Sequence, residues 1–325
     1  MRLVILSRSA TIPSTRRLVE AAKARGHVVR VLDPLRVEMH LDSKRATLFY
    51  KRRKLRRFDV VIPRIAQSVN VYGLAVLNQF AIRGSALMNT AQGISQARNK
   101  MRVLQLLSSN GLDIPATVMA RDAKDLKSMV NLVGGVPVLV KLLQGQDKTG
   151  VMVIESLQSL EAALEAVLGL GHQIVVQQYV RKGGQDLRVL VVGGEAVAAV
   201  RRKPRMGRMA HTLLQGARLE PYELSDRQRH AAVEAARLVG LEVAAVDLLF
   251  VKGSAKVFEV NASPAIGPME AATGVDVAAR IIERAERLAA ERPISPPRPP
   301  VGKRRSLKDA GLQASKVSAA PEEPR

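Results

Sequence analysis

The stretch VFEVNASPAIGPMEAATG, residues 257–274, carries a carboxylate and a carboxamide two positions apart in an apolar segment. Glu259 and Asn261 flank Val260, and side chains at positions i and i+2 of a strand lie on one face. Upstream, AAVDLLFV (244–251) places Asp247 inside a second apolar segment. If the two segments pair as a hairpin around residues 252–254, three oxygen-bearing side chains converge. Such a set is typical of a Mg²⁺ site that also holds phosphates, although the same alternation describes an ordinary strand with one solvent face.

The composition limits the kind of protein. A chain of 325 residues with 47% hydrophobic residues is long enough for two or three domains with real cores. It has no apolar run of about 18 residues, so no membrane partner is expected, and its first apolar run is too short for a signal peptide. The chain has no cysteine, which excludes disulfides, thiol catalysis and zinc–thiolate sites. A cytoplasmic protein fits this composition.

The net charge of +22 favours anionic partners. An Arg-rich proteome would produce the same excess. Aromatic residues make up only 3% of the chain and tryptophan is absent, so direct specific nucleic-acid binding is not expected. The segment KRRKLRR (51–57) is predicted to be a solvated hairpin, and it could also dock an acidic partner.

The order of elements predicts an α/β fold with α+β character in its later part. Residues 1–95 alternate strands with a helix capped at Ser14-Thr15, which predicts a parallel sheet. Residues 96–185 start with a helix over 96–110 and continue with strands, a second helix and a polar loop, 144–155, that carries two glycines. In residues 186–290, antiparallel strands turn at Gly193-Gly194, and Ser225 caps a helix. The remaining residues, 291–325, are rich in Pro, Ser and charge, including the basic run 303–305, and are expected to be disordered.

Several cations stand where a nucleotide would need them. Lys141 lies in an apolar strand, where an ammonium group is costly unless it meets an anion. Lys100 begins an amphipathic helix, and Asp186 and Arg188 alternate at the start of a strand. Arg201 and Arg202 end the next strand. Taken together with the glycine loop and the Asp/Glu/Asn set, these residues predict a nucleotide site with metal-assisted phosphoryl transfer.

On these residues the sequence resembles the ATP-grasp superfamily and, within it, the RimK-like glutamate ligases. The resemblance covers residues 1 to about 290. It rests on nine short motifs, of which EVNASP is the most specific: ILSR (5–8), LDPL (32–35), IPRI (62–65), VGG (133–135), VKL (140–142), DLRVLVVG (186–193), AAVDLL (244–249), EVNASP (259–264) and ATGVDVA (272–278).

The resemblance implies a pre-ATP-grasp α/β domain (1–95), two ATP-grasp subdomains (96–185 and 186–290) that clamp ATP, and a homo-oligomer. It implies an ATP-dependent ligase that adds glutamate, or a similar amino acid, to a protein or peptide C-terminus, with a ribosomal protein as the expected acceptor. Two other readings stay open: a ligase for a small amino-dicarboxylate or peptide, and a nucleotide-binding regulator without catalysis.

The resemblance also implies roles for individual residues. Asp247, Glu259 and Asn261 would hold two Mg²⁺ or Mn²⁺ ions. The residues implied to contact ATP are Lys100, Lys141, Gln178, Tyr179, Asp186 and Arg188. The residues implied in catalysis are Arg202, Arg208 and His211.

This sequence departs from the family pattern at three places. Gln178 stands where similar ligases carry a glutamate, and Gln144 replaces the glutamate that begins the glycine loop. The segment GRMAHTLLQGA (207–217) replaces an aromatic-Arg-Ser-Asn segment that approaches the transferring phosphate. Arg208 is one position from the expected arginine, and His211 stands at the asparagine position, where it also fits an ordinary surface histidine. These changes put catalysis in doubt more than nucleotide binding.

Overall fold

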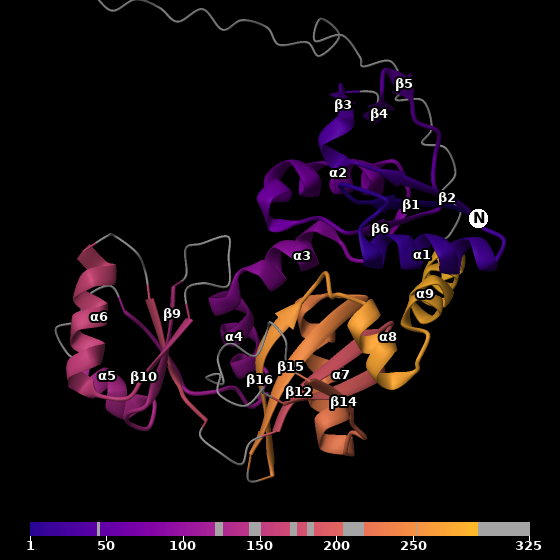
Figure 1. Ribbon diagram of the computed structural model, residues 1–325. Coiled ribbons are helices and arrows are strands. Elements are labelled where there is room, and N and C mark those ends of the chain that lie inside the picture. Colours follow the sequence, from indigo (N-terminus) through magenta and orange to yellow (C-terminus); the bar gives the residue numbers. More distant parts are fainter. Residues whose placement is uncertain are drawn as a thin grey trace, which may run out of the picture. The chain divides into compact units, whose positions relative to one another are not determined.

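The strands predicted in the first ninety residues form a parallel sheet, the N-terminal sheet, in a computed structural model of the chain (Figure 1). Its order is β2-β1-β6-β7. Helix α1 (Pro13–Ala24) packs against one face and α2 (Asn70–Ile82) against the other, which buries both faces of the sheet. This burial explains why its central strands are apolar throughout. The strands are β1 (Arg2–Leu6), β2 (Val28–Leu32), β6 (Val60–Pro63) and β7 (Ala86–Leu87).

The structure describes residues 1–43, 46–120, 126–142, 151–169, 174–180, 185–203, 218–251 and 253–291, and residues 1–291 form one compact unit. Three predictions fall outside the described residues: the glycine loop around residues 144–150, the segment that holds Arg208 and His211, and the tail from residue 292. None of the helices in the described ranges is both long enough and apolar enough to cross a membrane.

Two helix predictions were wrong. The single helix expected over 96–110 is two helices, α3 (Ala91–Arg98) and α4 (Lys100–Ser109), because Asn99 adopts an extended backbone and its side chain caps α4 by accepting from Arg102 N–H. Helix α1 begins at Pro13, where proline's missing N–H costs nothing, and not with a Ser14-Thr15 cap. The hydroxyl of Thr15 instead bonds that of Ser7.

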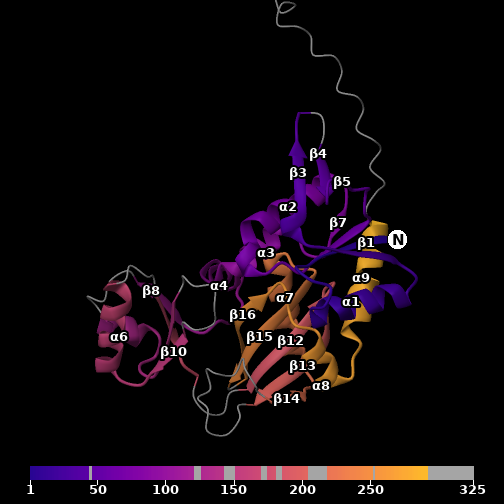
Figure 2. The ribbon, with the colours of Figure 1, turned by 45° about the horizontal axis from the view of Figure 1, so that its top comes forward.

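A small three-stranded sheet, β3-β4-β5, extends from the N-terminal sheet region and carries the predicted basic hairpin (Figure 2). Its strands are β3 (Val37–Leu41), β4 (Ala46–Tyr50) and β5 (Arg53–Lys54). Lys51 and Arg52 form the turn between β4 and β5, so the hairpin prediction is confirmed. Two short 3₁₀ helices, η1 (Pro34–Arg36) and η2 (Gln67–Val69), lie in this part of the chain.

The central sheet has the order β10-β9-β11-β8 and is antiparallel. Helices α5 (Leu126–Leu132) and α6 (Leu157–Gly169) cover one face of it, where Val130, Leu160 and Leu164 join the same apolar cluster as the strands. The strands are β8 (Thr117–Ala120), β9 (Val138–Leu142), β10 (Val151–Ile154) and β11 (Ile174–Gln178).

The C-terminal sheet has five antiparallel strands in the order β14-β13-β12-β15-β16. Its first hairpin turns at Gly193 and Gly194, as predicted, with φ angles of 58° and 82° that favour glycine. Helix α7 (Asp226–Val239) starts with the predicted Ser225 cap, which forms a reciprocal capping box with Gln228. The strands are β12 (Gln185–Val192), β13 (Glu195–Lys203), β14 (Arg218–Pro221), β15 (Val243–Val251) and β16 (Ser254–Asn261).

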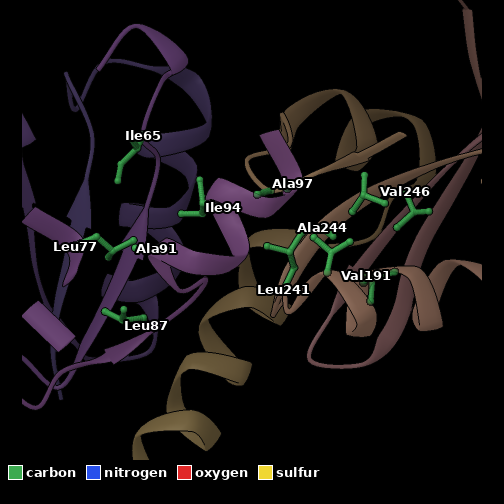
Figure 3. Packing of buried hydrophobic residues seen from close by; sticks show 14 of the residues in the cluster. Ile65, Leu77, Leu87, Ala91, Ile94, Ala97, Val191, Leu241, Ala244 and Val246 are labelled. Carbon is green, nitrogen blue, oxygen red and sulfur yellow. The ribbon is translucent and has the colours of Figure 1, made fainter. Parts of the chain in front are cut away.

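Helices join the N-terminal and C-terminal sheets. Ala91, Ile94 and Ala97 of α3 lie in one apolar cluster with side chains of both, as Figure 3 shows. On the opposite face of the C-terminal sheet lie α8 (Gly267–Thr273) and α9 (Val277–Glu291). Arg25, the residue that follows α1, bonds Glu286 of α9, and helices α1 and α9 lie side by side.

Candidate active site

Three charged side chains lie next to one another across the C-terminal sheet. In the antiparallel ladders, Arg188 of β12 is the direct partner of Asp247 of β15, and Asp247 is the direct partner of Glu259 of β16. Directly opposed residues of an antiparallel pair lie on the same face of the sheet. The predicted pairing of the Asp247 and Glu259 strands is therefore confirmed.

A β-bulge in β16 turns Glu259 toward this face. Asp247 pairs with Glu259, but the next residue, Leu248, pairs with Val257, so Phe258 is the extra residue. Strict alternation would have placed Glu259 on the core face with Ala255 and Val257, which are buried. After the bulge Val260 points into the core, and Glu259 and Asn261 share the other face.

Two arginines hold the aspartates of this face. Arg188 donates from Nε and Nη2 to the two carboxylate oxygens of Asp247, at 2.7 Å each. Arg202 donates from Nη1 to Asp247 Oδ2 at 3.1 Å, and from Nε and Nη2 to Asp186 Oδ1. The side chain of Asp247 is only 1% exposed and that of Arg202 only 5%. Such two-pronged, charge-assisted bonds fix the orientation of the groups they join.

Burial and pairing pull the pKa values of these groups in opposite directions. Burial raises the pKa of Asp186 above its usual range, although the adjacent Arg202 opposes the shift. Burial would lower the pKa of Arg188, but its hydrogen bonds to Asp247 and the charge of that carboxylate raise it overall. Arg188 therefore stays charged in this site.

Two lysines approach the same face from other parts of the fold. Lys100, the first residue of α4, places Nζ 3.5 Å from Glu259 Oε1. Lys141 of β9 donates from Nζ to Gln177 Oε1 at 2.6 Å. Burial lowers the pKa of Lys141 to about 8; the charge of Lys100 adds to the shift and that of Glu259 opposes it. Since its bonded partner is a neutral amide, Lys141 is a cation available to an incoming anion.

Phe258 is a residue of this site that the sequence analysis missed. Its ring centroid lies 5.9 Å from Lys141 Nζ and 5.9 Å from Arg202 Cζ, within cation–π range of both. The sequence signal for it is a break in the two-residue period of the core positions. Ala255 and Val257 are two residues apart, but the next core position, Val260, is three residues further on.

The structure brings together most of the predicted site residues but not all. We call the following set the charged face: Asp186, Arg188, Arg202, Asp247, Glu259 and Asn261, with Lys100 and Lys141 beside it. Gln178 ends β11, with its N–H bonded to Ala116 C=O, and Tyr179 follows it; no hydrogen bond or ion pair within the described part of the chain joins either to the charged face. Arg208 and His211 lie outside the described residues.

The charged face offers few oxygen donors for a metal ion. The candidate donors are the carboxylates of Asp247 and Glu259 and the amide of Asn261. Both oxygens of Asp247 already accept from arginines, and Asn261 Oδ1 accepts from Ser263 N–H. In the described ranges no three His, Cys, Asp or Glu side chains are grouped to hold an ion by themselves. Mg²⁺ is commonly held by one or two carboxylates and completed by phosphates and water. The donor set therefore fits Mg²⁺ that arrives with a phosphorylated ligand, and four cations against three carboxylates leave an excess of positive charge for it.

Comparisons with known proteins agree along the whole folded chain. The RimK pre-ATP-grasp domain model matches residues 1–94, and the RimK-like ATP-grasp domain model matches residues 97–285. A protein of Thioalkalivibrio sulfidiphilus (strain HL-EbGR7), described as a "probable alpha-L-glutamate ligase", is 44% identical over 290 residues, which are 89% of this chain and 96% of that protein. A protein of Halorhodospira halophila (strain DSM 244 / SL1) with the same description is 42% identical over 288 residues, 88% of this chain and 95% of that one.

A solved structure has the same fold. The ATP-grasp ligase PsnB, complexed with a minimal precursor, Mg and ADP, superposes with a TM-score of 0.71 at 22% identity and covers 89% of this chain and 98% of its own. The resemblance noted in the sequence and the α/β ATP-grasp fold expected from it are both confirmed. This chain belongs to the RimK-like ATP-grasp family and is an ATP-dependent ligase with a pre-ATP-grasp domain at its start.

Proposed function

We propose that this protein uses ATP and Mg²⁺, or Mn²⁺, to join the amino group of glutamate, or of a similar amino acid, to a carboxylate of a protein or peptide. The observation that carries the proposal is the charged face, where carboxylate and amide oxygens lie among four cations. Two further facts support it: the curated relatives are described as probable alpha-L-glutamate ligases, and PsnB has been seen with Mg and ADP.

The reaction balances without a nucleophilic side chain. An oxygen of the acceptor carboxylate attacks the γ-phosphorus of ATP, which forms an acyl phosphate and releases ADP. The amino nitrogen of glutamate then attacks the acyl carbon and loses a proton. Inorganic phosphate leaves with the oxygen that came from the carboxylate, and an amide remains. What the protein contributes is positioning and charge stabilisation.

The charged face supports a division of roles among its residues. Asp247, Glu259 and Asn261 would hold one or two divalent ions, which offset negative charge on the phosphoryl group when bound. Lys141 and Lys100 would bind phosphate oxygens, and Arg188 would hold Asp247 in place. Arg202 would stabilise the acyl phosphate.

The remaining predicted roles rest on the sequence. Gln178 and Tyr179 are proposed to meet the adenine, and Arg208 and His211 to stand near the transferring phosphate. Asp186 was expected near the ribose. Its bonds to Arg202 support a different role for Asp186, which is to orient the Arg202 side chain.

The acceptor we propose is a ribosomal protein. The net charge of +22 suits an acceptor that is bound to an anionic particle such as the ribosome. Membership of the RimK-like family supports the same acceptor. The departures in residues 207–217 keep a small dicarboxylate or peptide acceptor open as the second candidate.

The test is ADP release by the purified full chain with Mg-ATP and glutamate, with and without ribosomes from the source organism, followed by intact-mass analysis. ADP together with a mass gain of glutamyl units on one protein supports the proposal and identifies the acceptor. ADP without any protein mass gain would favour the small acceptor. Tight nucleotide binding with no ADP under any condition would contradict the ligase proposal and favour a regulator.

A further inference from the structure

The β4–β5 hairpin carries a concentration of positive charge that the ligase chemistry does not use. We call residues 46–57 the basic hairpin; its tip, its second strand and the two residues that follow Leu55 carry six exposed cations, namely Lys51, Arg52, Arg53, Lys54, Arg56 and Arg57. Within the described ranges, no carboxylate forms an ion pair with any of them. Several arginines elsewhere are paired: Arg17, Arg25 and Arg284 each bond a glutamate. The hairpin therefore gathers six cations without carboxylate partners in one short stretch of the chain.

The basic hairpin is anchored to the core. Leu48 and Leu55 are 0% and 3% exposed, and Leu55 N–H donates to Leu48 C=O at 2.8 Å. From the neighbouring segment, Arg83 Nη2 donates to Leu55 C=O at 2.7 Å. The cations are thus displayed from a fixed ribbon, which reduces the entropy lost when a partner binds.

The tip of the hairpin is strained in a way that points to function. Lys51 and Arg52 have φ angles of 50° and 61°. Two-residue turns with positive φ at both positions favour Asn-Gly or Gly-Gly, because a Cβ atom is unfavourable there. Lys and Arg at these positions keep two cations at the tip at the expense of backbone stability, and such strain is concentrated at functional sites.

The arrangement of the charges favours one kind of partner. Arg53 and Lys54 are consecutive in β5, so they point to opposite faces of the ribbon. Lys51 and Arg52 form the tip itself. An acidic peptide would meet only one face. An A-form RNA duplex has a wide, shallow minor groove with a phosphate backbone along each side, so cations on both faces and at the tip of a ribbon can meet phosphates there.

We propose that the basic hairpin is a docking surface for the phosphate backbone of double-stranded RNA. RNA is preferred to DNA because the proposed acceptor is ribosomal, and to that extent the inference rests on the proposed function. The contact is not expected to read base sequence, because it has no exposed aromatic side chain at the tip or on β5. It would hold the enzyme beside an RNA-bound acceptor.

The test measures binding of a fluorescent 20-base-pair RNA duplex to the full chain over a range of KCl concentrations. The hairpin variant is Lys51→Asn/Arg52→Gly/Arg53→Gln/Lys54→Gln, which also relieves the strain at the tip. The matched control removes four other exposed cations that have no carboxylate partner in the described residues: Lys23→Gln/Arg30→Gln/Arg102→Gln/Arg229→Gln. Both variants keep the basic tail.

The hairpin variant should bind about tenfold or more weakly at 0.1 M KCl, and its slope of log affinity against log salt should fall by roughly 3 to 4. The control should keep most of the wild-type slope. Equal losses in both variants would mean that net charge alone is responsible and would overturn the proposal. Equal binding of a DNA duplex would overturn the choice of RNA, and tighter, hairpin-dependent binding of poly-glutamate would make an acidic polypeptide the partner.

Two features keep this result interpretable. The melting temperature of the four-residue hairpin variant should not fall, since Asn and Gly suit positive φ and all four positions are exposed, so a loss of binding cannot come from unfolding. RNA binding requires neither ATP nor an acceptor. A failure here is therefore distinct from a failure of the ligase assay.

Discussion

Asp247 and Glu259 are opposed residues on β15 and β16, and the bulge at Phe258 is what turns Glu259 toward Asp247. Like charges directly opposite each other destabilise a sheet. Here Arg188 and Arg202 bond Asp247, and Lys100 lies 3.5 Å from Glu259. The cations therefore stabilise a pair of opposed carboxylates, so that a divalent ion and a polyanion can bind there together.

Replacing Asp247 with asparagine should destabilise the fold. The change leaves the guanidinium groups of Arg188 and Arg202 buried against a neutral amide, and removal of one partner from a buried ion pair costs about 3 to 5 kcal/mol. The measurement is urea denaturation near neutral pH. Glu220→Gln is the matched control on the same sheet, because Glu220 bonds Arg201 and Lys203 where water competes. A denaturation midpoint for Asp247→Asn equal to that of the wild type would contradict the assigned network.

Mg²⁺ should bind only when a nucleotide is present. Two carboxylates and one amide leave half of a six-coordinate shell to phosphates and water. Calorimetry should detect no saturable Mg²⁺ binding to the free protein at 1 mM, on the order of the affinity of weak sites, but clear binding with a non-hydrolysable ATP analogue. Glu259→Gln should weaken that second binding step, whereas Glu195→Gln, remote from the charged face, should not. Tight Mg²⁺ binding without nucleotide would show that another site holds the ion.

Affinity for the ATP analogue should fall as pH rises through about 8, the value to which burial lowers the pKa of Lys141. Only the protonated ammonium attracts phosphate. Lys141→Arg should remove this pH dependence, because a guanidinium stays charged. Lys141→Met should bind about 1 to 3 kcal/mol more weakly at pH 7, as expected for the loss of a charged hydrogen bond. An unchanged affinity in Lys141→Met would exclude the phosphate-binding role.

The same pKa shift makes a prediction about stability. The pKa of folded Lys141 lies below the ordinary 10.5, so the unfolded chain binds more protons between pH 8 and 10.5. The contribution of Lys141 to stability therefore rises with pH across that window. Lys141→Met should be more stable than the wild type at pH 7 and lose that advantage near pH 10.5. A constant difference between the two proteins would contradict the shifted pKa.

Deleting Phe258 should leave Glu259 and Asn261 on the charged face, because Phe258 is the extra residue and Val257, Glu259, Val260 and Asn261 then alternate regularly against β15. Phe258→Leu keeps the bulge and its apolar character. It should fold normally and lose about 0.5 to 1 kcal/mol of nucleotide affinity for each cation–π contact removed. Thermal unfolding and analogue binding are measured for both variants. A deletion variant that fails to fold would contradict the register in which Phe258 is the extra residue.

The sequence predicted the hairpin that unites Asp247 with Glu259, because two apolar segments flank a short turn that contains Gly253. It did not predict how Glu259 comes to face Asp247, since a bulge depends on how two strands pair and not on either strand alone. The bonds of Arg202 to Asp186 and Asp247 could not be predicted from the sequence for the same reason, because they depend on the register of three strands. Asn99 was missed as a helix break because it lies between two segments that are both helical.

The most direct test of the central claim is transfer of oxygen from the acceptor to phosphate. The acceptor found by mass analysis would be prepared with ¹⁸O in its carboxylate and incubated with Mg-ATP, glutamate and the enzyme, with Glu259→Gln as the inactive comparison. The account predicts one ¹⁸O atom in each inorganic phosphate released, in step with amide formation. Unlabelled phosphate would mean that water, and not the carboxylate, attacks ATP, and would contradict the ligase mechanism assigned to the charged face.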